Sequence, residues 1–112
     1  MAYDEELAAR IRELMLDEDG VREQKMFGGL AFLVAGHMTV AASGQGGLLV
    51  RVDPAESDEL VATTAADEAV MRGRPMTGWL RVSADAVRTK RELRRWVDRS
   101  VRYARSLPPK KR

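Results

Sequence analysis

The chain has 112 residues, a common length for one domain with one hydrophobic core, so a second folding unit is not expected. It contains no cysteine, which excludes disulfides and thiolate sites, and its 45% hydrophobic content argues against general disorder. The formal net charge of +2 hides a polarised distribution, because residues 1–80 hold 14 acidic and 7 basic side chains whereas residues 81–112 hold 3 acidic and 12 basic ones.

The N-terminal segment does not have the pattern of a secretory signal. It is acidic and opens no apolar stretch. The longest apolar run, residues 30–35, is far too short to span a bilayer. We therefore expect a cytoplasmic protein that does not contact a membrane.

The first elements predicted along the chain are one helix and four short strands. Asp4 is placed to cap the helix, an apolar stripe follows at helical spacing, and Gly20 ends it. Short glycine-rich connections join the strands, so neighbouring strands should be antiparallel. The strands are predicted at residues 22–27, 30–34, 38–43 and 48–52.

The second half of the chain predicts two more helices and one more strand. Asp53 and Pro54 are typical of a helix start, and this helix should run through residue 61. Residues 62–75 carry weaker signals, with a short helical turn expected at residues 67–71. A fifth strand is predicted at residues 76–82. Thr89 and Glu92 have capping-box spacing, which opens a last helix running to about residue 107.

The predicted element order is α-β-β-β-β-α-β-α. This order is typical of an α+β domain, in which helices pack on an antiparallel sheet of about five strands. The domain should span residues 1–107, and residues 108–112 should form a disordered basic tail.

Several short motifs resemble landmarks of one known family. Residues 25–32, Lys-Met-Phe-Gly-Gly-Leu-Ala-Phe, followed by Gly36-His37-Met38, resemble the signature of the TfoX/Sxy N-terminal domain family. Residues 73–79 and 107–110 resemble its later landmarks, so the resemblance covers about residues 3–110. It implies a fold similar to that of secretion-chaperone-like α+β proteins. Two-domain relatives regulate natural competence, in transcription together with the cyclic-AMP receptor protein. The sequence matches only the first of those two domains, and single-domain relatives generally lack an assigned activity.

The signature block has a structural interpretation. Gly28 and Gly29 allow the chain to reverse or bulge between two strands, where side chains would clash. Phe27 and Phe32 are then expected in the core. A ligand site at this block is the alternative. The structural signature consists of Met26, Phe27, Gly28, Gly29 and Phe32.

Chemistry-bearing residues are few and scattered. His37 is the only histidine, which rules out a multi-histidine metal site within one chain, and it should lie in a turn, with a solvated or capping role. The glycine-rich residues 44–47 precede a strand rather than a helix, which favours a hairpin loop over a phosphate site. The acidic clusters fall at helix ends and on exposed faces. We therefore predict no catalytic residues, no metal site, no cofactor and no enzymatic activity.

The last helix carries an apolar arc and an opposite basic arc. The apolar arc, which should face the core, consists of Leu93, Trp96, Val97, Val101, Tyr103, Ala104 and Leu107. The basic arc is a solvated face, partly paired with acidic groups of this molecule or of a partner, or else a nucleic-acid contact, with a membrane-surface role as a third alternative. Nucleic-acid binding through it should be weak, directed at the phosphate backbone and steeply salt-dependent. The candidate contacts are Arg91, Arg94, Arg95, Arg99, Arg102 and Arg105, with Lys90 beside them.

Trp79 and Arg81 should share one face of the fifth strand. Trp79 is expected to be buried under a helix, or else to form a protein interface together with Arg81. Residues 30–34 are apolar on both faces, and three helices of this size do not obviously cover both. We therefore expect a homodimer.

Three functional hypotheses follow. The leading one is a non-enzymatic regulatory or adaptor domain that acts through protein–protein contacts with a partner that the sequence does not identify. The second is a nucleic-acid-binding accessory protein that uses the basic arc. The third is an enzyme whose carboxylates and arginines meet across a dimer groove.

Overall fold

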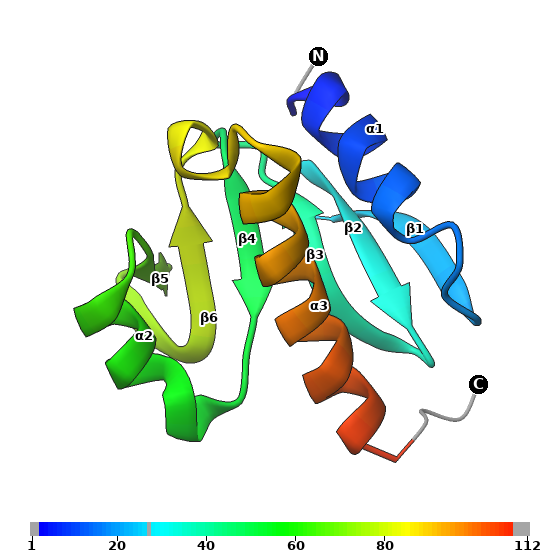
Figure 1. The fold of residues 1–112 in the computed structure, drawn as a ribbon. Helices are drawn as coiled ribbons and strands as arrows, with labels where there is room; N and C mark the ends of the chain where they lie inside the picture. The colour runs from blue at the N-terminus through cyan, green and yellow to red at the C-terminus, as the bar shows by residue number, and fades with distance from the viewer. Residues whose placement is uncertain (1–2, 27, 109–112) are drawn as a thin grey trace.

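The computed structural model describes residues 3–26 and 28–108 (Figure 1). Three α-helices are present in this part of the chain: α1 (Glu5–Leu14), α2 (Ser57–Thr63) and α3 (Lys90–Ser106). Two short 3₁₀ helices, η1 (Pro54–Glu56) and η2 (Ala84–Val87), precede α2 and α3. The strands are β1 (Val21–Met26), β2 (Gly29–Val34), β3 (His37–Ala42), β4 (Leu48–Arg51), β5 (Asp67–Met71) and β6 (Arg74–Val82).

The strands form one antiparallel sheet in the order β1-β2-β3-β4-β6-β5. Helix α3 lies across β3 and β4, α1 lies beside it toward β2, and α2 packs beside β6 (Figure 1). We call the side of the sheet that these helices cover the helix face, and the opposite side the open face. The predicted α+β class, the antiparallel sheet and the order of the predicted elements are confirmed, with one strand added.

The added strand corrects the prediction of a helical turn at residues 67–71. These residues form β5, which pairs with β6 on both sides of a bulge. The two strands are joined by Arg72 and Gly73, whose φ angles of 52° and 76° fit a two-residue type I′ hairpin turn. The pairing supplies the backbone hydrogen bonds of β5, so the strand does not depend on a strong local propensity.

The β5–β6 hairpin is sharply bent. Glu68 pairs with Leu80 but Val70 pairs with Pro75, so residues 76–79 of β6 correspond to the single residue Ala69 of β5. Gly78 lies in this bulge with a φ of 90°, and its N–H donates a hydrogen bond of 3.4 Å to Ser57 Oγ. The bend carries the tip of the hairpin over the open face of the sheet.

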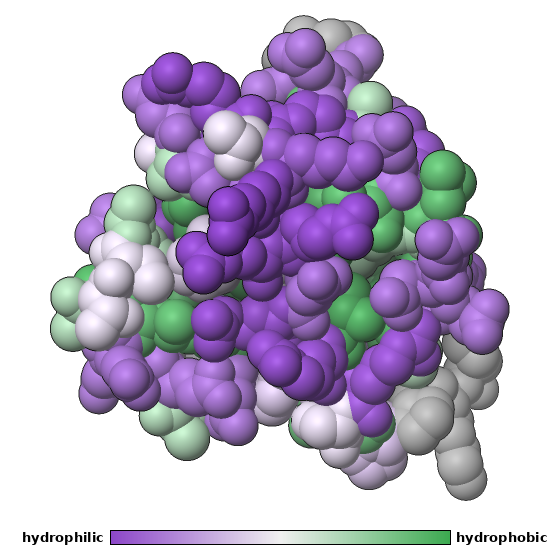
Figure 2. Space-filling view, viewed as in Figure 1, coloured by the Kyte–Doolittle hydropathy of each residue, from purple (hydrophilic) through white to green (hydrophobic). Residues whose placement is uncertain are grey.

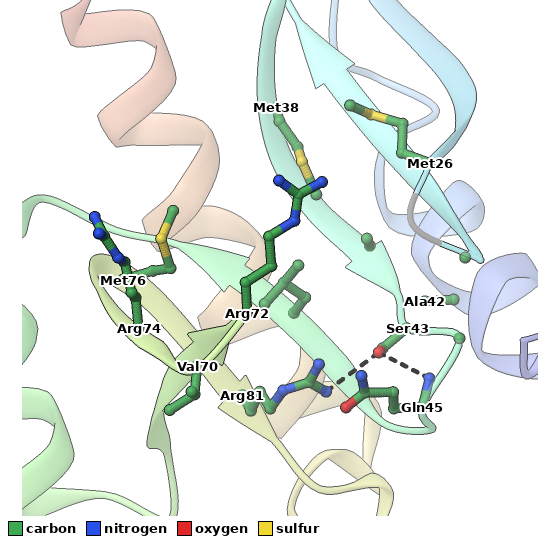
Figure 3. A pocket seen from close by; sticks show the side chains of 14 residues that line it. Met26, Met38, Ala42, Ser43, Gln45, Val70, Arg72, Arg74, Met76 and Arg81 are labelled. Carbon is green, nitrogen blue, oxygen red and sulfur yellow. Dashed lines mark hydrogen bonds between the residues drawn. The ribbon is translucent and has the colours of Figure 1, made fainter.

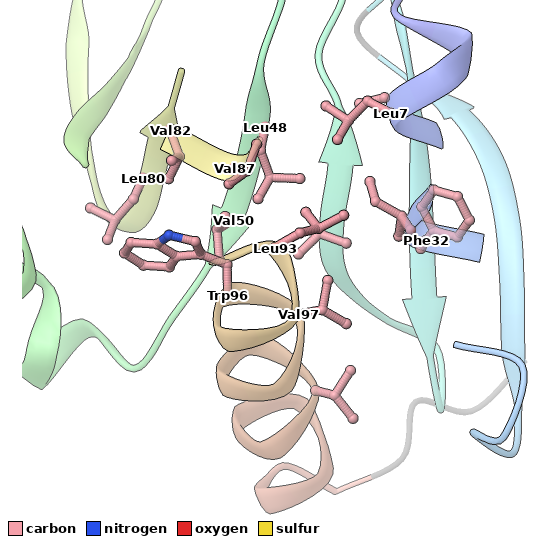
Figure 4. Close-up of a cluster of buried hydrophobic side chains, with 14 of the residues drawn as sticks. Leu7, Phe32, Leu48, Val50, Leu80, Val82, Val87, Leu93, Trp96 and Val97 are labelled. Carbon is pink, nitrogen blue, oxygen red and sulfur yellow. The ribbon is translucent and has the colours of Figure 1, made fainter. Parts of the chain in front are cut away.

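The main core lies between the helices and the helix face. Figure 4 shows Leu93, Trp96 and Val97 of α3 directed at strands of the sheet, and Leu7 of α1 beside Phe32. A second, smaller apolar cluster lies on the open face and is built from strands alone. It consists of Ala31, Met38, Ala41, Leu49 and Ala69, with Met26, Leu33 and Trp79 partly buried against them.

The signature block forms the turn between β1 and β2. Gly28 has a φ of 77°, and Gly29 packs so closely against β3 that a Cβ atom there would overlap the carbonyl oxygen of Ala42. Phe32 is fully buried. Phe27, which the sequence places in the core, lies outside the described residues.

His37 corrects the expectation of a solvated turn. It begins β3, is only 7% exposed, and its Nε2 donates a 2.6 Å hydrogen bond to the carbonyl oxygen of Pro108. The segment after α3 therefore covers this side chain, a contact that joins residues 71 positions apart. Of the predicted tail, only Pro108 belongs to the described part of the chain.

An exposed ion pair ties α1 to β1 and gives a pH-dependent prediction. Arg12 Nη2 donates to Glu23 Oε1 at 2.8 Å, and this hydrogen bond lowers the pKa of Glu23. The stabilisation of the folded protein by this pair is complete above the unfolded-state pKa of glutamate. It is lost as the pH falls through the lowered folded-state pKa of Glu23. Because the pair is exposed, Glu23→Gln should lower the unfolding free energy at pH 7 by only about 0.5 kcal/mol. Urea unfolding of both proteins at pH 7 and at strongly acidic pH measures this. A difference that persists undiminished in acid would contradict it.

Candidate functional site

Helix α3 is fixed at its start by the predicted capping box. Thr89 Oγ1 accepts a 3.1 Å hydrogen bond from the N–H of Glu92, and the Glu92 carboxylate accepts one of 3.1 Å from the N–H of Thr89. The hydrogen bonds from Thr89 lower the pKa of Glu92. Both partners satisfy backbone donors that have no partner within the helix, so the helix begins at a defined residue and its arcs take a defined direction.

The apolar arc of α3 faces the sheet, as the periodicity predicts. Tyr103 and Leu107 are half-buried at its C-terminal end. Ser100 is also buried and donates a 2.7 Å hydrogen bond to the carbonyl oxygen of Thr39, at the β-bulge where β2 and β3 shift register. The helical spacing could place Ser100 on this arc, but not reveal its partner. The fully buried part of the arc consists of Leu93, Trp96, Val97, Val101 and Ala104.

The opposite side of α3 presents arginines to solvent, and we call it the basic helix face. It consists of Arg91, Arg94, Arg95, Arg99, Arg102 and Arg105, all exposed except for the half-buried Arg99. Figure 2, viewed from this side, shows a mostly hydrophilic surface over α3.

Two of these arginines are paired with acidic groups from other elements. Arg99 Nη1 lies 3.2 Å from Glu56 Oε1, and its guanidinium carbon lies 5.9 Å from the centre of the Trp96 ring. Arg105 Nη2 lies 2.8 Å from Glu18 Oε1 and also donates to the carbonyl oxygen of Asp19. These contacts join the basic C-terminal segment to the acidic N-terminal part.

The other four arginines of the basic helix face form no ion pair with any residue of 3–26 or 28–108. They are Arg91, Arg94, Arg95 and Arg102. Their guanidinium groups remain available for a charged partner.

A groove of 750 Å³ adjoins the basic helix face between α2 and α3. Its charged lining has both signs, with three glutamates beside two arginines, and Leu60 and Trp96 contribute apolar surface. The sequence could not indicate this groove, because it depends on how α2 packs beside α3. The lining residues are Glu56, Glu59, Leu60, Thr63, Thr64, Ala65, Ala86, Glu92, Arg95, Trp96 and Arg99.

Trp79 and Arg81 share one face of β6, as predicted, but this is the open face. Trp79 is half-buried among residues of strands only, so the expected burial beneath a helix is wrong. Trp79 lies opposite Arg51 of β4, whose guanidinium carbon is 5.6 Å from the centre of its ring. Arg81 Nη1 donates a 3.2 Å hydrogen bond to Ser43 Oγ. Neither residue adjoins the basic helix face.

Neither a metal site nor a membrane-spanning helix is found in the part of the chain that the structure describes. No group of three or more histidine or acidic side chains there could hold a metal ion. Likewise, none of its helices is long and apolar enough to cross a membrane.

Comparison with known proteins identifies the family. Neither the curated proteins nor the solved structures contain a match to this chain. The model of the TfoX N-terminal domain matches residues 13–104, nearly the whole chain. The resemblance carried by the Met-Phe-Gly-Gly block is thereby confirmed, and the chain belongs to the TfoX N-terminal domain family.

Proposed function

We propose that this protein is a non-enzymatic regulatory or adaptor domain, related to competence regulation, that binds a partner protein through the basic helix face and the adjoining groove. Family membership supports a regulatory role. The observation that carries the choice of surface is the set of four exposed arginines without an ion pair to a described residue, beside a groove that bears both signs of charge.

The charges of the groove favour a protein over a nucleic acid. A phosphate backbone that approached Arg95 and Arg99 would also approach Glu56, Glu59 and Glu92, which line the same groove. A protein surface can present acidic groups to the arginines and basic or neutral groups to the glutamates, which gives electrostatic complementarity. The apolar surface of Leu60 and Trp96 adds area that such a partner could bury.

Nucleic-acid binding is the second candidate, and the exposed arginines are the observation in its favour. Guanidinium groups pair well with phosphate oxygens. Binding would be confined to the exposed rim of α3, because the other side of the helix is buried in the core. It would then be directed at the phosphate backbone and would weaken steeply with salt.

Charge reversal on the basic helix face tests the proposal. Arg94→Glu combined with Arg95→Glu should reduce recovery of the partner protein from native cytosol at least tenfold, because like charges would then face each other in the complex. Arg22→Glu combined with Lys25→Glu, a matched reversal on the exposed strand β1, should leave recovery unchanged. The measurement is a pull-down with quantitative mass spectrometry.

Retention on duplex DNA at low salt separates the two candidates. If the wild type binds DNA and the Arg94, Arg95 double variant does not, while no protein depends on these arginines, the nucleic-acid function replaces the proposal. Equal protein recovery by wild type and double variant would also contradict it. The homodimer and the cytoplasmic location stay predictions.

A further inference from the structure

A cavity of 590 Å³ opens on the open face of the sheet, away from the basic helix face. Its floor is formed by β3 and β4, and the bent tip of the β5–β6 hairpin forms one wall (Figure 3). This volume lies in the range of sites that enclose small organic ligands. The lining residues are Met26, Gly29, Met38, Ala41, Ala42, Ser43, Gly44, Gln45, Leu49, Val70, Arg72, Arg74, Met76 and Arg81.

Much of the cavity lining is apolar and adaptable. Met26, Met38 and Met76 enter it from three different strands, and Leu49 contributes to the floor. Methionine side chains are unbranched and flexible, so they adjust to ligands of irregular or variable shape. Val70 lines the cavity although it is 54% exposed, so a ligand would cover apolar surface that is otherwise in water.

The ionisable groups that line the cavity are all basic. Arg72, Arg74 and Arg81 line it, and no acidic side chain of residues 3–26 or 28–108 does. Unlike Arg99 and Arg105 on the other side of the sheet, these three form no ion pair with a described residue. Guanidinium groups beside an apolar cavity create a positive potential in a region of reduced solvent, which favours an anionic group attached to an apolar body.

Arg81 is held in place for such a role. Its Nη1 donates to Ser43 Oγ, which also accepts a 3.1 Å hydrogen bond from the N–H of Gln45. Figure 3 shows Arg81 reaching toward Ser43 and Arg72 extending across the sheet on the side of the hairpin. The hydroxyl of Ser43 satisfies only one of the five guanidinium donors, which leaves others for an anion.

We propose that this cavity binds a small amphiphilic carboxylate with an unbranched alkyl chain, such as a medium-chain fatty acid. The three arginines, which line different parts of the cavity (Figure 3), would supply the positive potential that holds the carboxylate, and the methionine-lined part would enclose the chain. Among the residues that the structure describes, no aromatic side chain lines the cavity, whereas flexible methionines do, which suits an alkyl chain. This inference does not rest on the proposed partner surface, which lies on the other side of the sheet.

Calorimetric titration of the full chain with acetate, octanoate, decanoate and decanol tests the proposal. Decanoate should bind, and octanoate should bind about fifteenfold more weakly, because each buried methylene contributes roughly a fourfold change in affinity. Decanol has the same chain without the charge and should bind at least tenfold more weakly than decanoate. Acetate should show no measurable binding. Equal affinities for decanoate and decanol, or no binding of decanoate, would overturn the proposal.

Two variants with matched controls test the location. Arg72→Gln combined with Arg74→Gln alters only exposed side chains and should weaken decanoate binding about tenfold or more, whereas Arg88→Gln should not change it. Val70→Glu places a like charge beside the carboxylate and should abolish binding, whereas Val61→Glu, at an exposed valine on α2, should not. Thermal unfolding checks that each variant is folded. Unchanged decanoate affinity in both folded cavity variants would overturn the proposal.

Discussion

Replacing Gly29 with alanine is expected to lower the free energy of unfolding by about 3 kcal/mol, near the upper end of the range for overpacking. A Cβ atom at this position would overlap the carbonyl oxygen of Ala42 and lie 3.0 Å from the backbone nitrogen of Gly44. Both neighbours are backbone atoms of the sheet, so neither can rotate away as a side chain would. Urea unfolding of wild type and variant gives the difference directly.

Gly44, in the loop between β3 and β4, is subject to the same close backbone approach. A Cβ atom at Gly44 would lie only 2.6 Å from the carbonyl oxygen of Gly28. The turn between β1 and β2 and the loop between β3 and β4 therefore meet backbone to backbone. The glycine pair of the signature is required by this close approach as well as by the positive φ of Gly28.

Gly73 provides the control for the Gly29 variant. It also lies in a turn, has a φ of 76°, and, apart from its two chain neighbours, no described residue has an atom within 4 Å of a Cβ built there. Gly73→Ala should therefore cost only the strain of a left-handed backbone, about 1 kcal/mol. Equal losses in the two variants would contradict the close-approach explanation and leave backbone conformation as the cause.

The parts of the fold that the sequence predicted well are those fixed by local chemistry. The capping box at Thr89, the apolar arc of α3 and the reversal at Gly28 each depend on residues a few positions apart. Strand β5 was missed because residues 67–71 lack a clear period-2 pattern, and their pairing with β6 is interrupted by a bulge. The hairpin signal that could have revealed it is Arg72-Gly73, the two-residue turn between the strands.

The candidate sites follow the same division. Helical spacing alone placed six arginines on one side of the last helix. It could not indicate which of them are paired, because Glu18 and Arg105 are 87 positions apart in the chain. The cavity on the open face depends on residues that are even more widely separated in the sequence. It forms only because the bulge at Gly78 bends one hairpin over strands from the first half of the chain.

The second large effect is expected at Phe32, the fully buried aromatic residue of the signature. Phe32→Ala should lower the free energy of unfolding by about 4 kcal/mol, because it removes buried apolar surface and leaves a cavity that the sheet cannot close. Phe32 belongs to the core that Leu7 and Ile11 of α1 also enter, and Figure 4 shows it beside Leu7. Phe32→Ala should therefore also accelerate hydrogen exchange more in α1 than in α3.

Leu33 is the matched control, because it is the next residue of the same strand and points to the open face. It is half-buried against the smaller strand-only cluster. Leu33→Ala should lower the free energy of unfolding by roughly 1 kcal/mol, because folding buries less apolar surface at this position than at Phe32. It should not change the rate of hydrogen exchange in α1. If both variants lost the same stability, the two faces of β2 would contribute equally to the core. The division into a helix face that holds the domain together and an open face left for binding would then be wrong.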